Sequence, residues 1–212
     1  MIPNACRAAA LLPVFFLCGC AAIPPVSGGA PRDDQAVLGP GLACTIPPPA
    51  AAGGTIDAAQ FIVAHFHDQT FTFQVQLQIT PKQFDLVAID NVGRRALTAN
   101  WNGVHLDFTR AQWLPTLVRP ADILTDVAIA YWPEGGIASA LSACGAHLAD
   151  TDGVRSVSAQ GRNLMTVNYV VGGGWNRAVH LYNLALGFGI DVQSEDLAQQ
   201  ASSTRSGTAG TY

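Results

Sequence analysis

The chain has 212 residues, of which 49% are hydrophobic and 12% are charged, and its formal net charge at pH 7 is −4. A chain of this length is normally one domain that buries a substantial core. The sequence has no run of Lys and Arg, which excludes the basic patch typical of nucleic-acid-binding proteins and of proteins that bind lipid headgroups by charge.

Residues 1–19 have the anatomy of a secretory signal peptide. Arg7 precedes an apolar run that is well short of the about 20 residues needed to span a bilayer. The segment LCGC at residues 17–20 resembles the bacterial lipobox, which implies that Cys20 begins the mature chain and carries a diacylglycerol and an N-acyl chain such as palmitate. Ala21 implies sorting to the outer membrane, with the domain facing the periplasm. The alternative is an ordinary signal peptide with incidental cysteines.

Two segments that flank the fold are predicted to lie outside it. Residues 20–56 are rich in Pro, Gly and Ala, a composition that is typical of a flexible tether. Residues 197–212 contain few hydrophobic side chains and are predicted to be disordered. The folded domain is therefore expected to span residues 57–196.

Residues 71–79 read FTFQVQLQI, in which apolar and polar side chains alternate without interruption. This alternation predicts a strand with one apolar face. Three turn signals extend the strand into an antiparallel meander over residues 70–108 and place its apolar side chains on one face. The predicted cross-strand pairs at these turns are Ile79 with Phe84, Asp90 with Arg95, and Trp101 with Val104, the last across a two-residue loop at Asn102-Gly103.

One helix and a second group of strands are expected after this meander. Pro120 suits the first turn of a helix, and apolar residues then recur at helical spacing, whereas Asp122 and Asp126 are assigned to the opposite side. Pro133 ends the helix. The later predicted strands cover residues 165–171, 175–181 and 188–192, with a hairpin turn at Gly172-Gly173-Gly174. The expected class is α+β, mostly antiparallel β.

A single helix of about twelve residues is too small to cover a wide sheet. The sheet is therefore expected to curl into an open half-barrel, with the helix as a plug or a lid over an apolar cavity. The candidate cavity-lining residues are Phe71, Phe73, Val75, Leu77, Ile79, Leu86, Trp101 and Leu106. The candidate residues of the lid and its hinge are Leu124, Val127, Tyr131, Trp132 and Pro133.

Few residues offer catalytic or metal-binding chemistry. His65 and His67 could share one face of a strand, but no third ligand has diagnostic spacing, so no metal or other cofactor is predicted. Cys144 and His147 lack the signature of a cysteine enzyme, and the protein is predicted not to be an enzyme. Cys44 and Cys144 are expected either to form a disulfide, in an oxidising compartment, or to stay as two buried thiols.

Four segments stand in order between residues 42 and 193: IPPP, DLVAIDNVGRRALTANWNGVHL, VRPADILTDVAIAYWP and GFGIDV. Their most specific positions are Gly93-Arg94-Arg95, Trp101-Asn102-Gly103 and Trp132-Pro133. Together they resemble an uncharacterised family of bacterial outer-membrane lipoproteins, often encoded beside genes for aryl polyene or other fatty-acid-like lipids and similar to the lipoprotein carriers LolA and LolB. The resemblance implies an unclosed barrel whose cavity receives acyl chains, and it carries over no functional residue beyond Cys20.

The resulting hypothesis is a membrane-anchored periplasmic carrier that binds the acyl part of a lipid, lipoprotein or polyene lipid and assists its transport or insertion into the outer membrane. Its expected partners are this cargo, the membrane through Cys20, and a periplasmic carrier or outer-membrane protein, but no nucleic acid. The chain itself is expected to be a monomer. The main alternative is a non-catalytic outer-membrane scaffold that binds a protein partner, and a weaker one is a periplasmic hydrolase that uses its histidines.

Overall fold

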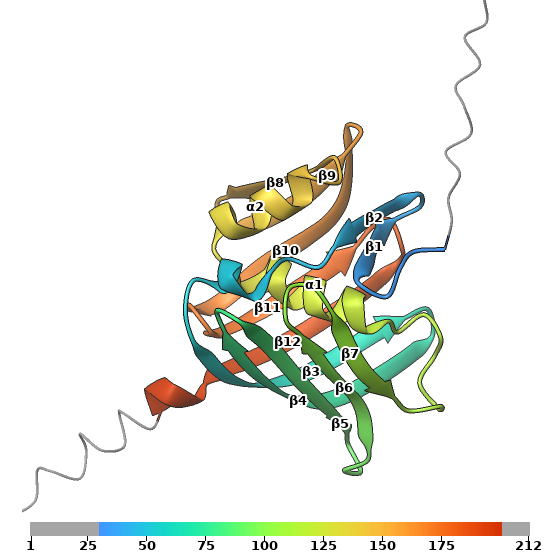
Figure 1. Ribbon diagram of the computed structural model, residues 1–212, viewed down its shortest axis with the longest axis vertical. Helices are drawn as coiled ribbons and strands as arrows, with labels where there is room; N and C mark the ends of the chain where they lie inside the picture. The colour runs from blue at the N-terminus through green and yellow to red at the C-terminus, as the bar shows by residue number, and fades with distance from the viewer. Residues whose placement is uncertain (1–29, 201–212) are drawn as a thin grey trace, which may run out of the picture.

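Ten strands form one antiparallel sheet within residues 30–200, the part of the chain that the computed structural model describes (Figure 1). The first five are β3 (Ile56–Phe66), β4 (Gln69–Thr80), β5 (Gln83–Asp90), β6 (Arg95–Trp101) and β7 (Leu106–Arg110). The other five are β8 (Ala146–Thr151), β9 (Val154–Ala159), β10 (Arg162–Gly173), β11 (Asn176–Asn183) and β12 (Phe188–Asp196). The predicted class, α+β with mostly antiparallel strands, is confirmed.

The sheet consists of two meanders that meet at its centre. Its strand order is β7-β6-β5-β4-β3-β12-β11-β10-β9-β8, so strands that are adjacent in the sheet are also consecutive in the chain, except for β3 and β12 at the junction. The edge strands β7 and β8 do not pair with each other, and the sheet is not closed. The junction brings together residues that are far apart in the sequence, such as Ala64 and Ile190.

Two α-helices connect the meanders in the described part of the chain, α1 (Pro120–Tyr131) and α2 (Glu134–Ser142). Figure 1 shows α1 in the middle of the molecule, with strands from both halves of the sheet around it, and α2 beside β8. Pro120 lies in the first turn of α1, as predicted, where a missing N–H is tolerated. The sequence did not predict α2, because Gly135 and Gly136 weaken a helix. Gly136 is needed there, since a Cβ would lie 2.4 Å from the Ala51 carbonyl oxygen.

The alternating segment is β4, and most of its predicted register is confirmed. Val75, Leu77 and Ile79 are buried, and the glutamines between them are exposed. The predicted pair of Ile79 with Phe84 is confirmed, and further pairs in the same meander are Leu77 with Leu86 and Phe84 with Trp101. A bulge after Ala88 changes the end of the β5–β6 hairpin, so Arg95 lies opposite Ile89 instead of Asp90.

The predicted two-residue loop at Asn102-Gly103 is wrong. Trp101 pairs with Leu106, because the Asn102 side-chain oxygen accepts a hydrogen bond from the Val104 backbone N–H (2.9 Å) within a wider turn. A shift of two residues keeps Leu106 on the predicted face, since side chains alternate with a period of two. Val104, in contrast, is 68% exposed.

Residues 35–52 are folded, although the sequence predicted them to be part of a flexible tether. They form β1 (Gln35–Gly39), β2 (Leu42–Thr45) and the 3-10 helix η1 (Pro49–Ala52). β1 and β2 pair with each other, and Ala36, Leu38 and Cys44 are buried in the core. The Val37 N–H donates a hydrogen bond to the Asp122 carboxylate on α1 (2.8 Å). These tertiary contacts outweigh the flexibility that Pro and Gly favour.

The structure describes only parts of the two segments that were predicted to flank the fold. The predicted signal peptide, the predicted lipidation site Cys20 and the first part of the predicted tether lie outside residues 30–200. Residues 201–212 of the predicted tail lie outside them as well, but residues 197–200 form a helical turn. The Asn176 side-chain amide donates a hydrogen bond to Gln199 Oε1 in that turn (2.6 Å), which replaces the predicted disorder there.

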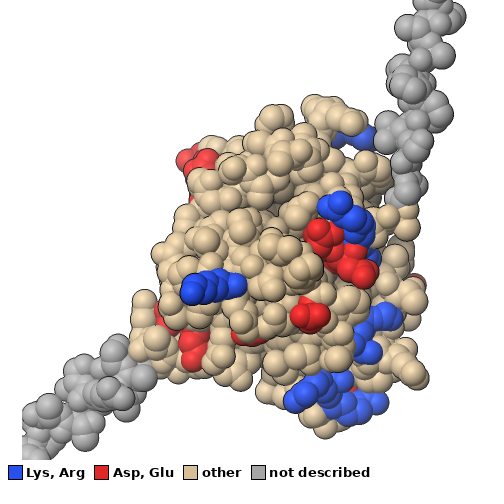
Figure 2. Space-filling view, in the orientation of Figure 1, with Lys and Arg blue, Asp and Glu red and all other residues tan. Residues whose placement is uncertain are grey.

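No helix within the described residues is both long enough and apolar enough to cross a bilayer. Charged side chains are sparse on the face drawn in Figure 2. The Lys and Arg side chains there form small groups, one of which lies directly beside Asp or Glu, and most of the face is uncharged. This face therefore presents no broad surface of one charge.

Candidate ligand cavity

A cavity of about 340 Å³ lies between α1 and one face of the ten-stranded sheet. Its wall is formed by α1, by β3 to β6, by β11 and β12, by Val37 of β1, and by residues 114–119, which lead into α1. Most of the lining side chains are apolar. The volume is within the range of small-molecule sites, about 300–1,000 Å³. The protein's own side chains therefore do not fill the whole space above the apolar face of the sheet.

The predicted lining residues divide between this cavity and the solid core. Those on the cavity wall are Phe71, Phe73, Val75 and Leu86. Those away from the wall are Leu77, Ile79 and Trp101, which are at most 1% exposed, and Leu106, which is half-buried on β7. Residues from outside the sheet pack against this part of its apolar face. The Trp132 ring lies 5.7 Å from that of Phe84, and Trp101 Nε1–H donates a hydrogen bond to the Pro47 carbonyl oxygen (2.9 Å).

Helix α1 is buried on nearly all sides. Ten of its twelve residues are buried, and it presents one face to the cavity. Of the residues predicted for a lid and hinge, Val127 and Tyr131 line the cavity, whereas Leu124 and Trp132 are buried away from its wall and Pro133 leads into α2. Of the two predicted roles, plug or lid, this burial favours the plug, because a helix that is apolar on nearly all sides is stable only when it is surrounded.

Two acidic residues of α1 face the cavity, although the sequence placed them on the opposite side. Asp122 and Asp126 are one helical turn apart and both line the wall. Asp126 is only 9% exposed, and burial raises the pKa of its carboxyl well above 3.8, with the nearby Asp122 adding to the rise. Among the described residues, none forms a hydrogen bond or ion pair with Asp126. The cavity thus contains an unpartnered carboxyl group that sequence reasoning missed.

Asp122 has partners but is also perturbed. Its Oδ1 accepts the hydrogen bond from Val37 N–H and lies 3.5 Å from the Arg119 guanidinium. Burial raises the pKa of Asp122 to about 6, and the Val37 N–H and Arg119 only partly oppose this shift. Gln60, on the facing strand β3, adds another polar side chain to the wall and donates a hydrogen bond to Ser194 Oγ (3.3 Å).

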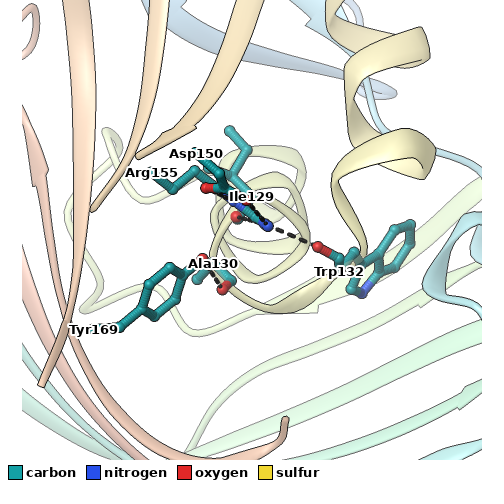
Figure 3. Close-up of polar contacts among 6 residues, drawn as sticks. All are labelled: Ile129, Ala130, Trp132, Asp150, Arg155 and Tyr169. Atoms are coloured by element: carbon teal, nitrogen blue, oxygen red, sulfur yellow. Dashed lines mark hydrogen bonds and ion pairs between the residues drawn. The ribbon is translucent and has the colours of Figure 1, made fainter. Parts of the chain in front are cut away.

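Two side chains from the second meander hold the C-terminal turn of α1 (Figure 3). Arg155 of β9 donates hydrogen bonds to the backbone oxygens of Ile129 (2.7 Å) and Trp132 (2.8 Å). Tyr169 of β10 donates its hydroxyl to the carbonyl of Ala130 (2.9 Å). The last carbonyl groups of a helix have no partner within the helix, and these contacts satisfy three of them. They fix the position of α1 and therefore of the cavity wall.

A family model described as "Protein of unknown function (DUF3261)" matches residues 57–196. The chain belongs to this family. The match confirms the prediction of a domain family of unknown function. It begins in β3 and ends in β12, so this DUF3261 domain contains α1 and the strands that line the cavity, except for β1, which contributes Val37. No curated protein matches the chain.

The histidines that the sequence paired are placed differently in the DUF3261 domain. His65 of β3 shares the Asp191 carboxylate with His180 of β11, and its Nε2 lies 3.2 Å from Asp191 Oδ2. Hydrogen bonds from His180 and His65 hold the pKa of Asp191 below its ordinary value. His67 lies in the turn between β3 and β4. Within residues 30–200, no group of three or more His, Cys, Asp or Glu side chains could hold a metal ion.

Cys44 and Cys144 form a disulfide in the structure. The sequence left this bond and a pair of buried thiols as alternatives. The bond joins β2 to the segment that follows α2, and it spans 100 positions of the chain. Because its sulfur is bonded to Cys44, Cys144 has no thiol to act as a nucleophile with His147.

The buried carboxyl groups predict that stability falls as the pH rises above about 4. With its pKa raised from 3.8 to about 6, Asp122 keeps a proton in the folded protein that the unfolded chain has already released. The protonated form is therefore favoured by folding, and about 3 kcal/mol of stability is lost between these pKa values. We expect Asp122→Asn to be more stable than the parent protein at about pH 7 by this amount. Urea unfolding between about pH 4 and pH 7 measures the effect.

Other groups titrate in the same range, so the decisive quantity is the difference in unfolding free energy between variant and parent. It should grow from near zero at about pH 4 to about 3 kcal/mol at about pH 7. Asp107→Asn, the same change at an exposed position of β7, serves as the control. A difference that does not change with pH would contradict the prediction.

Proposed function

We propose that this protein is a lipid-anchored periplasmic carrier of the LolA and LolB kind, which binds the acyl part of a lipid, lipoprotein or polyene lipid and assists its transport or insertion into the outer membrane. Cys20 is the proposed lipidation site, and the ten-stranded sheet acts as an open half-barrel around α1. The observation that carries the proposal is the apolar cavity of about 340 Å³. The lipobox-like segment at residues 17–20 supports the membrane anchor.

Burial of apolar surface is the proposed source of affinity. Each methylene group removed from water contributes about 0.8 kcal/mol. A chain of about ten such groups therefore provides several kcal/mol after the cost of immobilising the ligand is subtracted. Along β4, the lining side chains change from half-buried at Phe71 and Phe73 to buried at Val75, which offers an extended chain a path from the surface into the core. Directional transfer requires only an acceptor that binds the cargo more tightly.

Native mass spectrometry of the chain with Cys20→Ser, purified from the periplasm without detergent, tests the carrier function. We expect a reproducible added mass that extracts as lipid. Phe73→Glu should abolish it, because a carboxylate on the apolar wall is desolvated by the bound chain. Circular dichroism would verify that the variant keeps its strands.

The matched control is Phe61→Glu, since Phe61 lies on the neighbouring strand β3 but is 45% exposed and does not line the cavity. This variant should retain the lipid. If the parent protein shows only the mass of its polypeptide, and takes up no lipid on incubation with phospholipid vesicles, the carrier function is contradicted.

A protein-binding scaffold is the second candidate function. It is favoured by the edge strand β7, where Phe108 is 41% exposed, and by Val104 beside it at 68% exposed. An edge strand with exposed apolar side chains can pair with a strand of another protein. The scaffold would be favoured if the mass spectrum showed no bound lipid and if a protein partner bound the parent protein but not the Phe108→Lys variant.

A further inference from the structure

Among the described residues, the cavity wall carries buried polar atoms that hydrogen bonds do not satisfy, such as Gln60 Oε1 and Arg119 Nη1, and one buried acid without a partner, Asp126. Asp126 is more than nine-tenths buried, and no side chain or backbone group of residues 30–200 pairs with its carboxyl. Its neighbours on the cavity face of α1 include Val127 and Ala130. A buried carboxyl group without a partner is destabilising. The Asp126 carboxyl is therefore a group to which a ligand in the cavity can supply the partner.

The charges around Asp126 favour a positively charged partner. Asp122, one turn earlier on α1, adds a second carboxyl to the same wall. Arg119 also lines the wall, but it lies 3.5 Å from Asp122 and forms its ion pair there. His65, the remaining basic side chain on the wall, is paired with Asp191. No cation of the described wall is thus paired with Asp126.

We infer that the cavity binds an alkyl chain bearing a basic nitrogen, with Asp126 as the counter-ion of the ammonium group. This inference rests on the proposed carrier function and names the ligand class of the same cavity. On binding, Asp126 loses its proton to water and the carboxylate pairs with the ammonium ion. Charge interactions are strong in an apolar cavity, so the pair offsets the desolvation of its two ions when the geometry is good. A carboxylate headgroup would instead place a like charge beside two acidic residues.

Isothermal titration calorimetry with dodecylamine, dodecanol and dodecanoate tests this assignment on the full-length chain carrying Cys20→Ser. The three probes share one alkyl chain and differ only in the headgroup. We expect dodecylamine to bind about tenfold more tightly than dodecanoate, which corresponds to about 1.4 kcal/mol. Asp126→Asn should weaken dodecylamine binding about tenfold and change dodecanol binding less than about twofold. Asp107→Asn, on the exposed face of β7, should leave all three affinities unchanged.

Each outcome bears on the counter-ion role of Asp126, on the carrier function, or on both. Equal affinity for the three probes, or unchanged dodecylamine binding in Asp126→Asn, would overturn the counter-ion role and leave the carrier function standing. Binding of none of the probes would overturn both. Thermal unfolding verifies that the variant is folded. Should Asp126→Asn not fold, the comparison of dodecylamine with dodecanoate on the parent protein still decides.

Discussion

Removal of the disulfide between Cys44 and Cys144 is expected to lower the free energy of unfolding by about 4–5 kcal/mol. The bond closes a loop of 100 positions, and the chain-entropy model assigns about this value to a loop of that length, because the bond restricts the unfolded chain. Such a loss is a large part of the about 5–15 kcal/mol by which a domain is normally stable. Urea unfolding of the oxidised protein and of the double variant Cys44→Ala, Cys144→Ala measures it.

Reduction separates the effect of the bond from that of the substitutions. Dithiothreitol should destabilise the parent protein by a similar amount and should leave the double variant unchanged. The β1–β2 hairpin is the region expected to loosen first, since the bond connects β2 to the segment after α2. Equal stability of the oxidised and the fully reduced parent protein would contradict the prediction.

Replacement of Arg155 by methionine is expected to lower the free energy of unfolding by about 3–5 kcal/mol. Arg155 is only 6% exposed and joins three elements of the fold. It pairs with Asp150 of β8 (2.7 Å) and donates to the Ile129 and Trp132 carbonyls at the end of α1 (Figure 3). Methionine fills a similar volume but donates no hydrogen bond, so the two carbonyls and the Asp150 carboxylate lose their donor. Unfolding in guanidinium chloride measures this decrease in the free energy of unfolding.

Two further variants test whether the donor groups of Arg155 are responsible. Arg162→Met removes an exposed guanidinium on β10 that forms no hydrogen bond or ion pair with other described side chains, and it should change stability by less than about 0.5 kcal/mol. Tyr169→Phe removes one hydrogen bond to the same helix turn and should cost about 1 kcal/mol. An Arg155→Met variant as stable as Arg162→Met would exclude the proposed role of Arg155 in fixing α1.

Local patterns predicted the first meander well. The alternation of β4 and the turns after it predicted the pairs that join β4, β5 and β6, because side-chain direction and turn geometry depend on a few neighbouring residues. β3 was missed because its continuous apolar run Phe61-Ile62-Val63-Ala64 has no period of two, and a short apolar run without that period does not distinguish a strand from other structure. β8 and β9 were missed as well, since they are short and rich in polar residues.

The acidic pair on α1 was accessible to sequence reasoning. The helix has apolar residues on nearly every side, including Ala121, Leu124 and Ile129, which is typical of a helix that is buried all round. Asp122 and Asp126 could therefore have been predicted to be buried, and buried acids frequently mark functional sites. The prediction of a polar outer side failed because it used spacing without considering how few polar residues the helix contains.

The sequence by itself determined where strands alternate, where chains turn and where α1 begins at Pro120, because each of these depends on backbone geometry within a few residues. Only the tertiary structure decided that Leu77 and Ile79 belong to the core whereas Phe71 and Phe73 line a cavity. These side chains share one face of β4 and one alternating pattern. What distinguishes them is the volume filled by residues from distant segments, and no local pattern encodes that volume.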